Sequence, residues 1–161
     1  MRPEASVQVR LAQPPDASAI RDLVCAAYAV WVPVIGREPL PMNVDYAKAL
    51  REHDIDLLFV DGALAGLIET VRQPDHLWIE NVAVRPDCQG RGWGRRLLAH
   101  AEEKANAAGL RQIRLLTNDA FAANVDLYTR FGYGIDRREA FMNGVTVYMS
   151  KSLSAAPRIG A

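Results

Sequence analysis

Three closely spaced glycines follow an apolar, β-rich run and precede an amphipathic segment. The run 79–84 ends at Arg85-Pro86, then comes Gly90-Arg91-Gly92-Trp93-Gly94, and a helical pattern of apolar residues begins at Trp93. A loop between a strand and a helix leaves backbone N–H groups free at the positive end of the helix dipole. These residue types at this spacing therefore predict a site for the phosphate groups of a ligand.

Two common phosphate loops do not fit this spacing. The dinucleotide fingerprint needs Gly-x-Gly-x-x-Gly, but Gly92 and Gly94 are one residue too close, and no suitable acid ends a strand about 20 residues later. The P-loop needs a Lys and a hydroxyl residue after its last glycine, whereas Arg95-Arg96 follow here. The pattern that fits is Gln/Arg-x-x-Gly-x-Gly/Ala, met by residues 89–94.

Hydrophobic periodicity and turn residues predict the element order β α α β β β α β α β β. We expect strands at residues 7–11, 56–60, 63–71, 76–84, 113–117, 135–141 and 145–149. We expect helices after the caps Asp16, Asn43 and Asn124 and over residues 93–108, with residues 30–42 too rich in proline for a regular helix. The tight turns would be Asp61-Gly62 and Asn143-Gly144.

This order defines the fold class. Consecutive strands joined by short turns imply antiparallel pairs, and the strand–helix–strand unit at residues 76–117 implies one parallel pair. We therefore expect an α/β fold (α+β, with a mixed sheet), in which a central, largely antiparallel sheet has helices on both faces.

Length and composition indicate one domain. The chain has 161 residues, of which 50% are apolar, and its 19 basic and 19 acidic residues balance. A balanced chain has no strong field for nucleic acid or for an anionic membrane, so we expect neither partner. No apolar signal segment begins the chain, and no segment reaches about 18 uninterrupted apolar residues. We expect a cytoplasmic domain over residues 1–152, with a flexible tail over residues 153–161.

The glycine loop and a second motif together resemble the GNAT superfamily of N-acetyltransferases. Residues 79–96 look like that family's core motif and residues 113–118 like its following strand, while Asn124-x-x-x-Tyr128-x-x-Phe131-Gly132-Tyr133 is similar to its second helix motif. The resemblance spans about residues 57–150. It implies acetyl-CoA as cofactor and direct transfer of acetyl to a primary amine of a small molecule or peptide, with no metal and no covalent enzyme intermediate.

The resemblance also implies a cofactor site. The pyrophosphate of coenzyme A would lie against the loop, where glycine lets the backbone approach closely. The pantetheine arm would pair with the backbone of a bulged strand that splays from its neighbour, and one strand N–H would polarise the thioester carbonyl. The implied cofactor residues are Val82, Ala83, Val84, Gln89, Gly90, Arg91, Gly92, Trp93, Gly94, Arg95, Thr117, Asn118, Asn124, Tyr128 and Phe131.

Two residues are candidates for catalysis. Tyr128 looks like the family's tyrosine near the thioester sulfur, a general acid for the departing thiolate; the alternative is a core tyrosine. Because alternate residues of a strand share a face, Glu80 is expected on the side of Val82 and Val84, and it is the first choice for the base. The alternative for Glu80 is an exposed or ion-paired carboxylate. Glu69 is the second choice for the base.

By the same resemblance, the acceptor would contact the N-terminal helices and the loop between them. The candidates are Tyr28, Trp31, Arg37 and Met42, and Arg37 suits a substrate carboxylate. The alternative is that Trp31 and Met42 only cover the core. The resemblance is compatible with a homodimer. Other functions stay open: transfer of another acyl group, a non-amine acceptor, or a non-catalytic acyl-CoA sensor.

Overall fold

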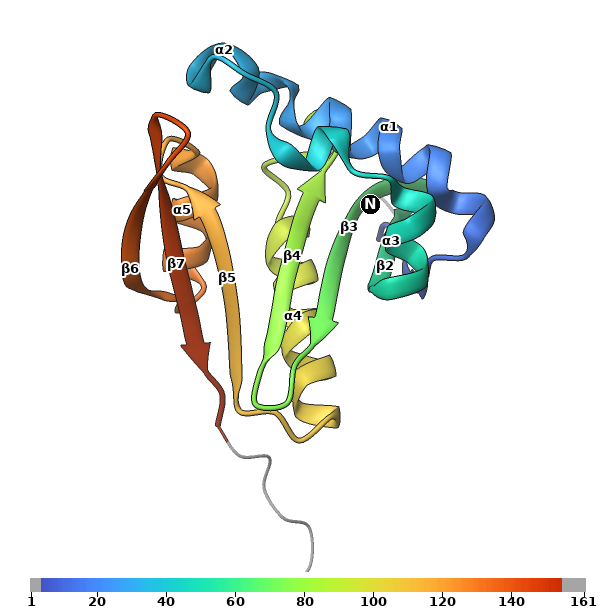
Figure 1. Cartoon of the computed structure of the whole chain (residues 1–161). Coiled ribbons are helices and arrows are strands. Elements are labelled where there is room, and N and C mark those ends of the chain that lie inside the picture. The colour runs from blue at the N-terminus through green and yellow to red at the C-terminus, as the bar shows by residue number, and fades with distance from the viewer. Residues whose placement is uncertain (1–3, 155–161) are drawn as a thin grey trace, which may run out of the picture.

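Seven strands form one sheet in the order β1-β2-β3-β4-β5-β7-β6 (Figure 1). The computed structural model describes residues 4–154. The strands are β1 (Val7–Leu11), β2 (Asp54–Val60), β3 (Ala63–Arg72), β4 (Leu77–Val84), β5 (Gln112–Asn118), β6 (Gly134–Phe141) and β7 (Gly144–Ser152). Every neighbouring pair is antiparallel except β4 and β5. The predicted mixed, largely antiparallel sheet is therefore confirmed.

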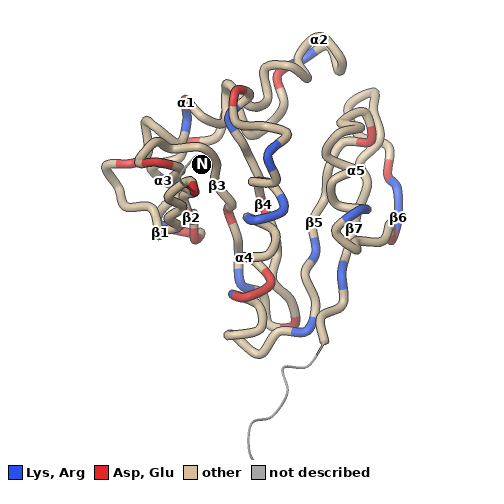
Figure 2. Tube along the Cα trace, turned by 180° about the vertical axis from the view of Figure 1, so that it is seen from behind, with Lys and Arg blue, Asp and Glu red and all other residues tan. Residues whose placement is uncertain are grey.

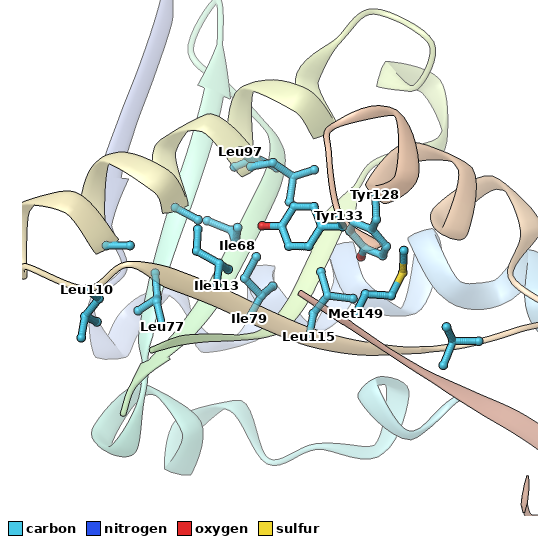
Figure 3. Packing of buried hydrophobic residues seen from close by; sticks show 14 of the residues in the cluster. Ile68, Leu77, Ile79, Leu97, Leu110, Ile113, Leu115, Tyr128, Tyr133 and Met149 are labelled. Atoms are coloured by element: carbon cyan, nitrogen blue, oxygen red, sulfur yellow. The ribbon is translucent and has the colours of Figure 1, made fainter. Parts of the chain in front are cut away.

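Helices cover both faces of this sheet (Figure 1). They are α1 (Ala17–Tyr28), α2 (Val32–Ile35), α3 (Tyr46–Glu52), α4 (Trp93–Ala107) and α5 (Ala122–Arg130). Helices α1 and α3 pack in one core cluster, while α4 and α5 pack in the other. Figure 3 shows the second cluster, in which Leu97 of α4 lies over Leu115 of β5 and the rings of Tyr128 and Tyr133.

The strands β4 and β5 are joined over only part of their length. Their parallel register runs from Leu77 opposite Ile113 to Ile79 opposite Leu115 and then stops. Beyond it the two strands diverge, as the upper half of Figure 1 shows. The backbone of residues 80–84 therefore faces a gap instead of a neighbouring strand on that side. Ligands of sheets with parallel strands commonly bind at the carboxyl ends of such strands.

A β-bulge lies in β4 at Glu80, which has no partner on β3. The extra residue reverses the alternation of side chains along the strand. Ile79 thus packs in the same cluster as Val82 and Val84, although it lies at an odd position of β4. Glu80 accepts a hydrogen bond from Trp78 on the opposite side, with Nε1 2.8 Å from Oε2. The prediction that Glu80 shares a face with Val82 and Val84 is wrong, because the sequence does not reveal the bulge.

One predicted helix cap lies elsewhere, and another keeps its position without a side-chain capping bond. Helix α3 is capped by Asp45 and not by Asn43, since Asp45 Oδ1 accepts from the backbone N–H of Lys48 at 3.2 Å. Asp16 does precede α1, but its carboxylate accepts from the backbone N–H of Gln13 at 2.8 Å. The carboxylate of Asp16 therefore caps the 3-10 turn Pro14–Asp16 that precedes α1, and it makes no capping bond to α1 itself.

The second half of the chain shows two similar shifts. Asn124 lies inside α5, and the N-cap position belongs to Phe121. The β6–β7 turn is Met142-Asn143, where φ is +47° and +62°, and Gly144 already pairs in β7. Both errors move a boundary without changing the order of elements. The predicted proline-rich irregular region contains α2 and short 3-10 turns.

Leu153, at the start of the predicted flexible tail, is held by the fold. The backbone N–H of Leu153 donates to the carbonyl of Arg111 at 2.8 Å, and its side chain packs on the core. Leu153 is thus part of the folded domain. The rest of the predicted tail, residues 155–161, lies outside the described residues.

One helical stretch within residues 4–154, Pro14–Ile35, would be long and apolar enough to cross a membrane by length and composition alone. A single such stretch is a weak sign, because core helices of globular proteins meet the same criterion. In this chain Ile20, Leu23 and Val24 of the stretch are buried in the core cluster beneath α1.

Candidate active site

Two cavities of about 540 and 520 Å³ meet where β4 and β5 diverge. The loop pocket, about 520 Å³, lies against the glycine loop, β4 and the starts of α4 and α5. The sheet pocket, about 540 Å³, lies against α3, β3, β4 and the end of β5. Tyr28, Val82 and Tyr128 line both pockets. Ligands in the two pockets can therefore touch at these three residues.

Most of the predicted cofactor residues gather in the loop pocket. They are Val82, Ala83, Val84, Gln89, Gly90, Gly92, Trp93, Gly94, Arg95, Asn124 and Tyr128. Thr117 and Asn118 line the sheet pocket instead. Arg91 is exposed and lines neither pocket. Phe131 lines neither pocket and packs on the core under the Lys151 ammonium, which lies 4.5 Å from its ring centre, so its contact with the cofactor stays a prediction.

The loop backbone is open toward the pocket. Gly90 and Gly92 have φ of +76° and +87°, a backbone conformation that residues with a side chain rarely adopt. A Cβ on either residue would meet nothing within 4 Å. Gln89 ties the loop to β4, because its Nε2 donates to the carbonyl of Val84 at 3.1 Å. Figure 2 shows basic residues around the start of α4. Free N–H groups, open space and positive charge together suit a phosphate.

Gly94 serves a different purpose from the other two glycines. Its φ is ordinary, and a Cβ there would lie 3.0 Å from Cδ2 of Leu127 in α5. The residue thus lets α4 and α5 pack closely. All three glycines line the loop pocket, but the open space that the prediction requires is present at Gly90 and Gly92, whereas Gly94 packs against Leu127.

We expect Gly94→Val to lower the free energy of unfolding by about 1–3 kcal/mol, because the added methyls overpack the contact with Leu127. Urea denaturation measures this loss. Leu127→Ala in the same chain makes room, so the double variant should lose less than the sum of the single losses. Additive losses would show that the two residues do not compete for this space.

Tyr128 lies buried between the two pockets. Its ring meets the ring of Tyr133 edge to face, with centres 6.0 Å apart (Figure 3). Burial raises the pKa of the Tyr128 hydroxyl above its ordinary value, so the phenol keeps its proton at neutral pH. The residue is thus both a core tyrosine and a proton donor that borders both pockets.

A row of polar side chains forms the floor of the sheet pocket. Glu69 of β3 lies directly opposite Asn81 of β4, so their side chains are neighbours. Asn81 Oδ1 accepts from the Tyr28 hydroxyl at 2.7 Å, and Glu69 Oε2 lies 2.6 Å from His53 Nδ1. Asn81 Nδ2 is buried with no hydrogen-bond partner within the described residues. A buried donor without a partner marks a place where a ligand group or a water can bind.

Sequence reasoning missed Asn81 and His53. Asn81 carried one signal, since an amide inside an apolar strand needs a partner for its polar atoms. His53 carried none, because its contact with Glu69 depends on how α3 packs against the sheet. Glu80, the first choice for the base, is exposed and lies at the edge of the same pocket.

The mouth of the sheet pocket is apolar. Four large apolar side chains from separate parts of the chain line it and remain 37–57% exposed, namely Leu40, Val44, Leu116 and Phe141. Exposed apolar side chains gathered around a cavity mark a binding surface. Arg37 lies beside them, with its guanidinium carbon 6.0 Å from the centre of the Phe141 ring.

The predicted acceptor residues divide between the pockets. Tyr28 lines both pockets and Arg37 lines the sheet pocket, whereas Trp31 lines the loop pocket and stacks on Phe121 at 4.9 Å. Met42 lines neither pocket and packs on the core beneath α1, which favours the alternative that it only covers the core. Within residues 4–154, no group of three His, Cys, Asp or Glu side chains is arranged to hold a metal ion.

Comparison with known proteins agrees with this geometry. The sequence model of the Acetyltransferase (GNAT) family matches residues 19–133. N-alpha-acetyltransferase 80 of Mus musculus is 38% identical over 69 residues, which are 43% of this chain and 21% of that protein. The chain thus spans about a fifth of the length of this curated relative.

Solved structures share the fold. PaiA N-acetyltransferase from Thermoplasma acidophilum, in complex with coenzyme A, has a TM-score of 0.79 at 16% identity, over 91% of this chain and 99% of that chain. The ribosomal-protein-S18-alanine N-acetyltransferase from Escherichia coli has a TM-score of 0.76 at 19% identity, over 97% and 100% of the two chains. The family match covers well over half of the sequence and includes the glycine loop and Tyr128. The chain therefore belongs to the acetyltransferase (GNAT) family, as its two motifs predicted.

Proposed function

We propose that the protein transfers the acetyl group of acetyl-CoA to a primary amine by direct attack of the amine on the thioester. The observation that carries this proposal is the meeting of the loop pocket and the sheet pocket at Tyr28, Val82 and Tyr128. A cofactor in the first pocket and an amine in the second would meet without any enzyme-bound intermediate. Family membership supports the same chemistry.

The residues of the loop pocket fit coenzyme A. The open backbone at Gly90 and Gly92 and the free N–H groups at the start of α4 would hold its pyrophosphate, with Arg95 adding positive charge. The gap beside Val82 and Val84 leaves strand backbone free for the pantetheine amides. When bound, acetyl-CoA supplies an activated acyl group with a thiolate leaving group.

The backbone of β4 supplies a donor for the developing oxyanion. The N–H of Arg85 donates to the carbonyl of Ala65 in β3 at 2.8 Å. Since N–H directions alternate along a strand, those of Val84 and Val82 point away from β3, into the gap that β5 leaves. An N–H held there by the sheet stabilises charge on the thioester oxygen without rearranging. The Tyr128 hydroxyl then protonates the departing thiolate.

The acceptor is proposed to be a primary amine that carries an apolar group. The apolar mouth of the sheet pocket suits an aromatic or branched aliphatic body, while Glu69 and Asn81 on the floor suit the polar end. Four acids also line this pocket, namely Asp45, Glu52, Glu69 and Glu80, so polyamines and aminoglycosides belong in the test panel as the competing acceptor class. Two of the similar proteins are named for N-alpha and alanine N-acetylation, so peptides belong among the candidates.

Release of coenzyme A from acetyl-CoA, followed with a thiol reagent, tests this function across a panel of amines. We expect kcat/KM to be at least about 10-fold higher for arylalkyl amines or peptides with an apolar first residue than for polyamines, since burying an apolar group adds about 1.5–3 kcal/mol. Tight binding of acetyl-CoA without acceleration by any amine would instead identify a non-catalytic sensor. Preference for polycations would contradict the acceptor class.

A further inference from the structure

We propose that Glu69 and His53, and not Glu80, form the pair that removes the proton from the acceptor amine. The proposal rests on the acetyl transfer proposed above and names the base for it. Glu69 is the more deeply placed carboxylate of the sheet pocket, with 3% of its surface exposed, whereas Glu80 is exposed. A group that takes a proton from the attacking amine must lie within hydrogen-bond reach of it or one water away, and the floor of the sheet pocket is where the amine end is proposed to bind.

Three elements hold Glu69 in place. It lies in the middle of β3, opposite Ile55 of β2 and Asn81 of β4, at the point where the bulge shifts the register. His53 ends α3 and brings Nδ1 to 2.6 Å from Glu69 Oε2. The side chain of His53 is 25% exposed and that of Glu69 is 4% exposed. The pair therefore leads from the floor of the pocket toward solvent.

Glu80 is less well placed for this role. Its Oε2 accepts from Trp78 Nε1 at 2.8 Å, which holds the carboxylate along the outer side of β4. Water competes for the remaining oxygen because the residue is exposed. The bulge places Glu80 in the same pocket as Glu69 and Asn81, so the two carboxylates differ in exposure and in hydrogen-bond partner.

The surroundings of Glu69 favour proton uptake. Burial raises the pKa of its carboxyl, the hydrogen bond and charge of His53 lower it, and the negative charge of Glu80 raises it further. The hydroxyls near it, Tyr28 from α1 and Tyr46 from α3, have pKa values that burial raises, so they stay neutral. The other charged side chains that line the same pocket are Asp45, Lys48 and Glu52 at α3 and Arg37 before it. The net pKa of Glu69 lies above the ordinary carboxyl value, which makes its carboxylate a stronger base than one in water.

Two protons leave the acceptor amine through Glu69 and His53. The ammonium N–H bond breaks and an O–H bond forms on Glu69, which leaves the nitrogen lone pair free to attack the thioester carbon. Glu69 passes this proton to His53, and His53 releases it to water. The second amine proton takes the same route as the tetrahedral intermediate collapses. Tyr128 protonates the thiolate and recovers a proton from solvent, so each turnover releases one proton.

Asn81 supports the assignment independently. Tyr28 donates to its Oδ1, while its buried Nδ2 has no hydrogen-bond partner within the described residues, and Asn81 lies directly across the strand pair from Glu69. A donor and an acceptor side by side on a buried floor can hold one small polar group, either the amine end of the acceptor with its neighbouring oxygen or a water that relays its proton.

Three variants test the pair through the pH dependence of kcat/KM for one amine at saturating acetyl-CoA. Glu69→Gln should lower kcat/KM about 10- to 100-fold at pH 7, and the loss should shrink to within about threefold near pH 10, where the amine is already neutral. His53→Gln should show a smaller loss with the same pH trend. Glu80→Gln should show a smaller loss that does not change with pH.

Two outcomes would overturn the proposal. A loss in Glu69→Gln that is the same at every pH would mean that Glu69 only shapes the pocket, and a pH-dependent loss in Glu80→Gln would return the role to Glu80. Calorimetry with acetyl-CoA separates these from failure of the function itself, because cofactor affinity should be unchanged in all variants. If Glu69→Gln does not fold, His53→Gln carries the test. A wild-type protein that acetylates no amine would overturn both proposals.

Discussion

Replacing Tyr128 by phenylalanine is expected to lower kcat for acetyl transfer by about 100- to 1000-fold, the usual contribution of a general acid. The affinity for acetyl-CoA should change by less than about threefold, because the phenyl ring preserves the packing between the pockets. The hydroxyl is the only group lost, and it is the protonated donor at the place where the pockets meet. Steady-state kinetics at saturating acetyl-CoA measure the effect.

Tyr133→Phe is the matched control for this variant. Tyr133 touches the ring of Tyr128 edge to face and is equally buried, but it lines neither pocket. Its hydroxyl oxygen is buried without a partner in the described part of the chain, so its removal should leave stability unchanged or raise it. Activity should stay at the wild-type level. A loss in Tyr133→Phe as large as that in Tyr128→Phe would mean that ring packing, and not proton donation, governs the rate.

Gly92→Asp is expected to weaken acetyl-CoA binding about 100-fold or more, a loss of about 2.7 kcal/mol in binding free energy. The new carboxylate would occupy the open space at the N-terminus of α4, where a pyrophosphate is proposed to bind, and would repel it. Titration calorimetry of acetyl-CoA measures the affinity directly.

Gly109→Asp separates this charge effect from backbone strain. Gly109 follows the other end of α4, has φ of +73° compared with +87° at Gly92, and likewise has nothing within 4 Å of a Cβ. Both substitutions place an Asp in a left-handed conformation, so both should cost similar stability. Only Gly92→Asp should lose affinity. Equal affinities in the two variants would contradict the assignment of the glycine loop.

Patterns formed by residues close together in the sequence predict most of the helices, strands and turns. The Asp61-Gly62 turn, the apolar stripe of α4 and the glycine stop after it depend on neighbouring residues, and the structure has each of them. The sequence does not fix the cap of α3, because Asn43 and Asp45 are both good capping residues and the structure uses Asp45. The family motifs also predict the loop pocket, because each motif consists of neighbouring residues, in one loop and in one helix.

The chemistry of the sheet pocket depends on contacts between distant parts of the chain. His53 meets Glu69 across 16 positions, and Tyr28 meets Asn81 across 53. Neither pair leaves a periodic or spaced signal in the sequence, because each arises where a helix packs on a sheet. The need for glycine at position 94 is also absent from the local sequence, because it arises from the side chain of Leu127 in another helix.

The sequence by itself thus determined the family, the order of elements and the phosphate-binding loop, because local backbone preference and periodicity encode them. Tertiary structure alone decided that Glu69 is buried and Glu80 is exposed in the same pocket. One extra residue in β4, at Glu80, changes which side chains point into the pocket. Strand register is set by pairing with β3 and by the core on each face, and a shift of one residue reverses every side chain beyond it.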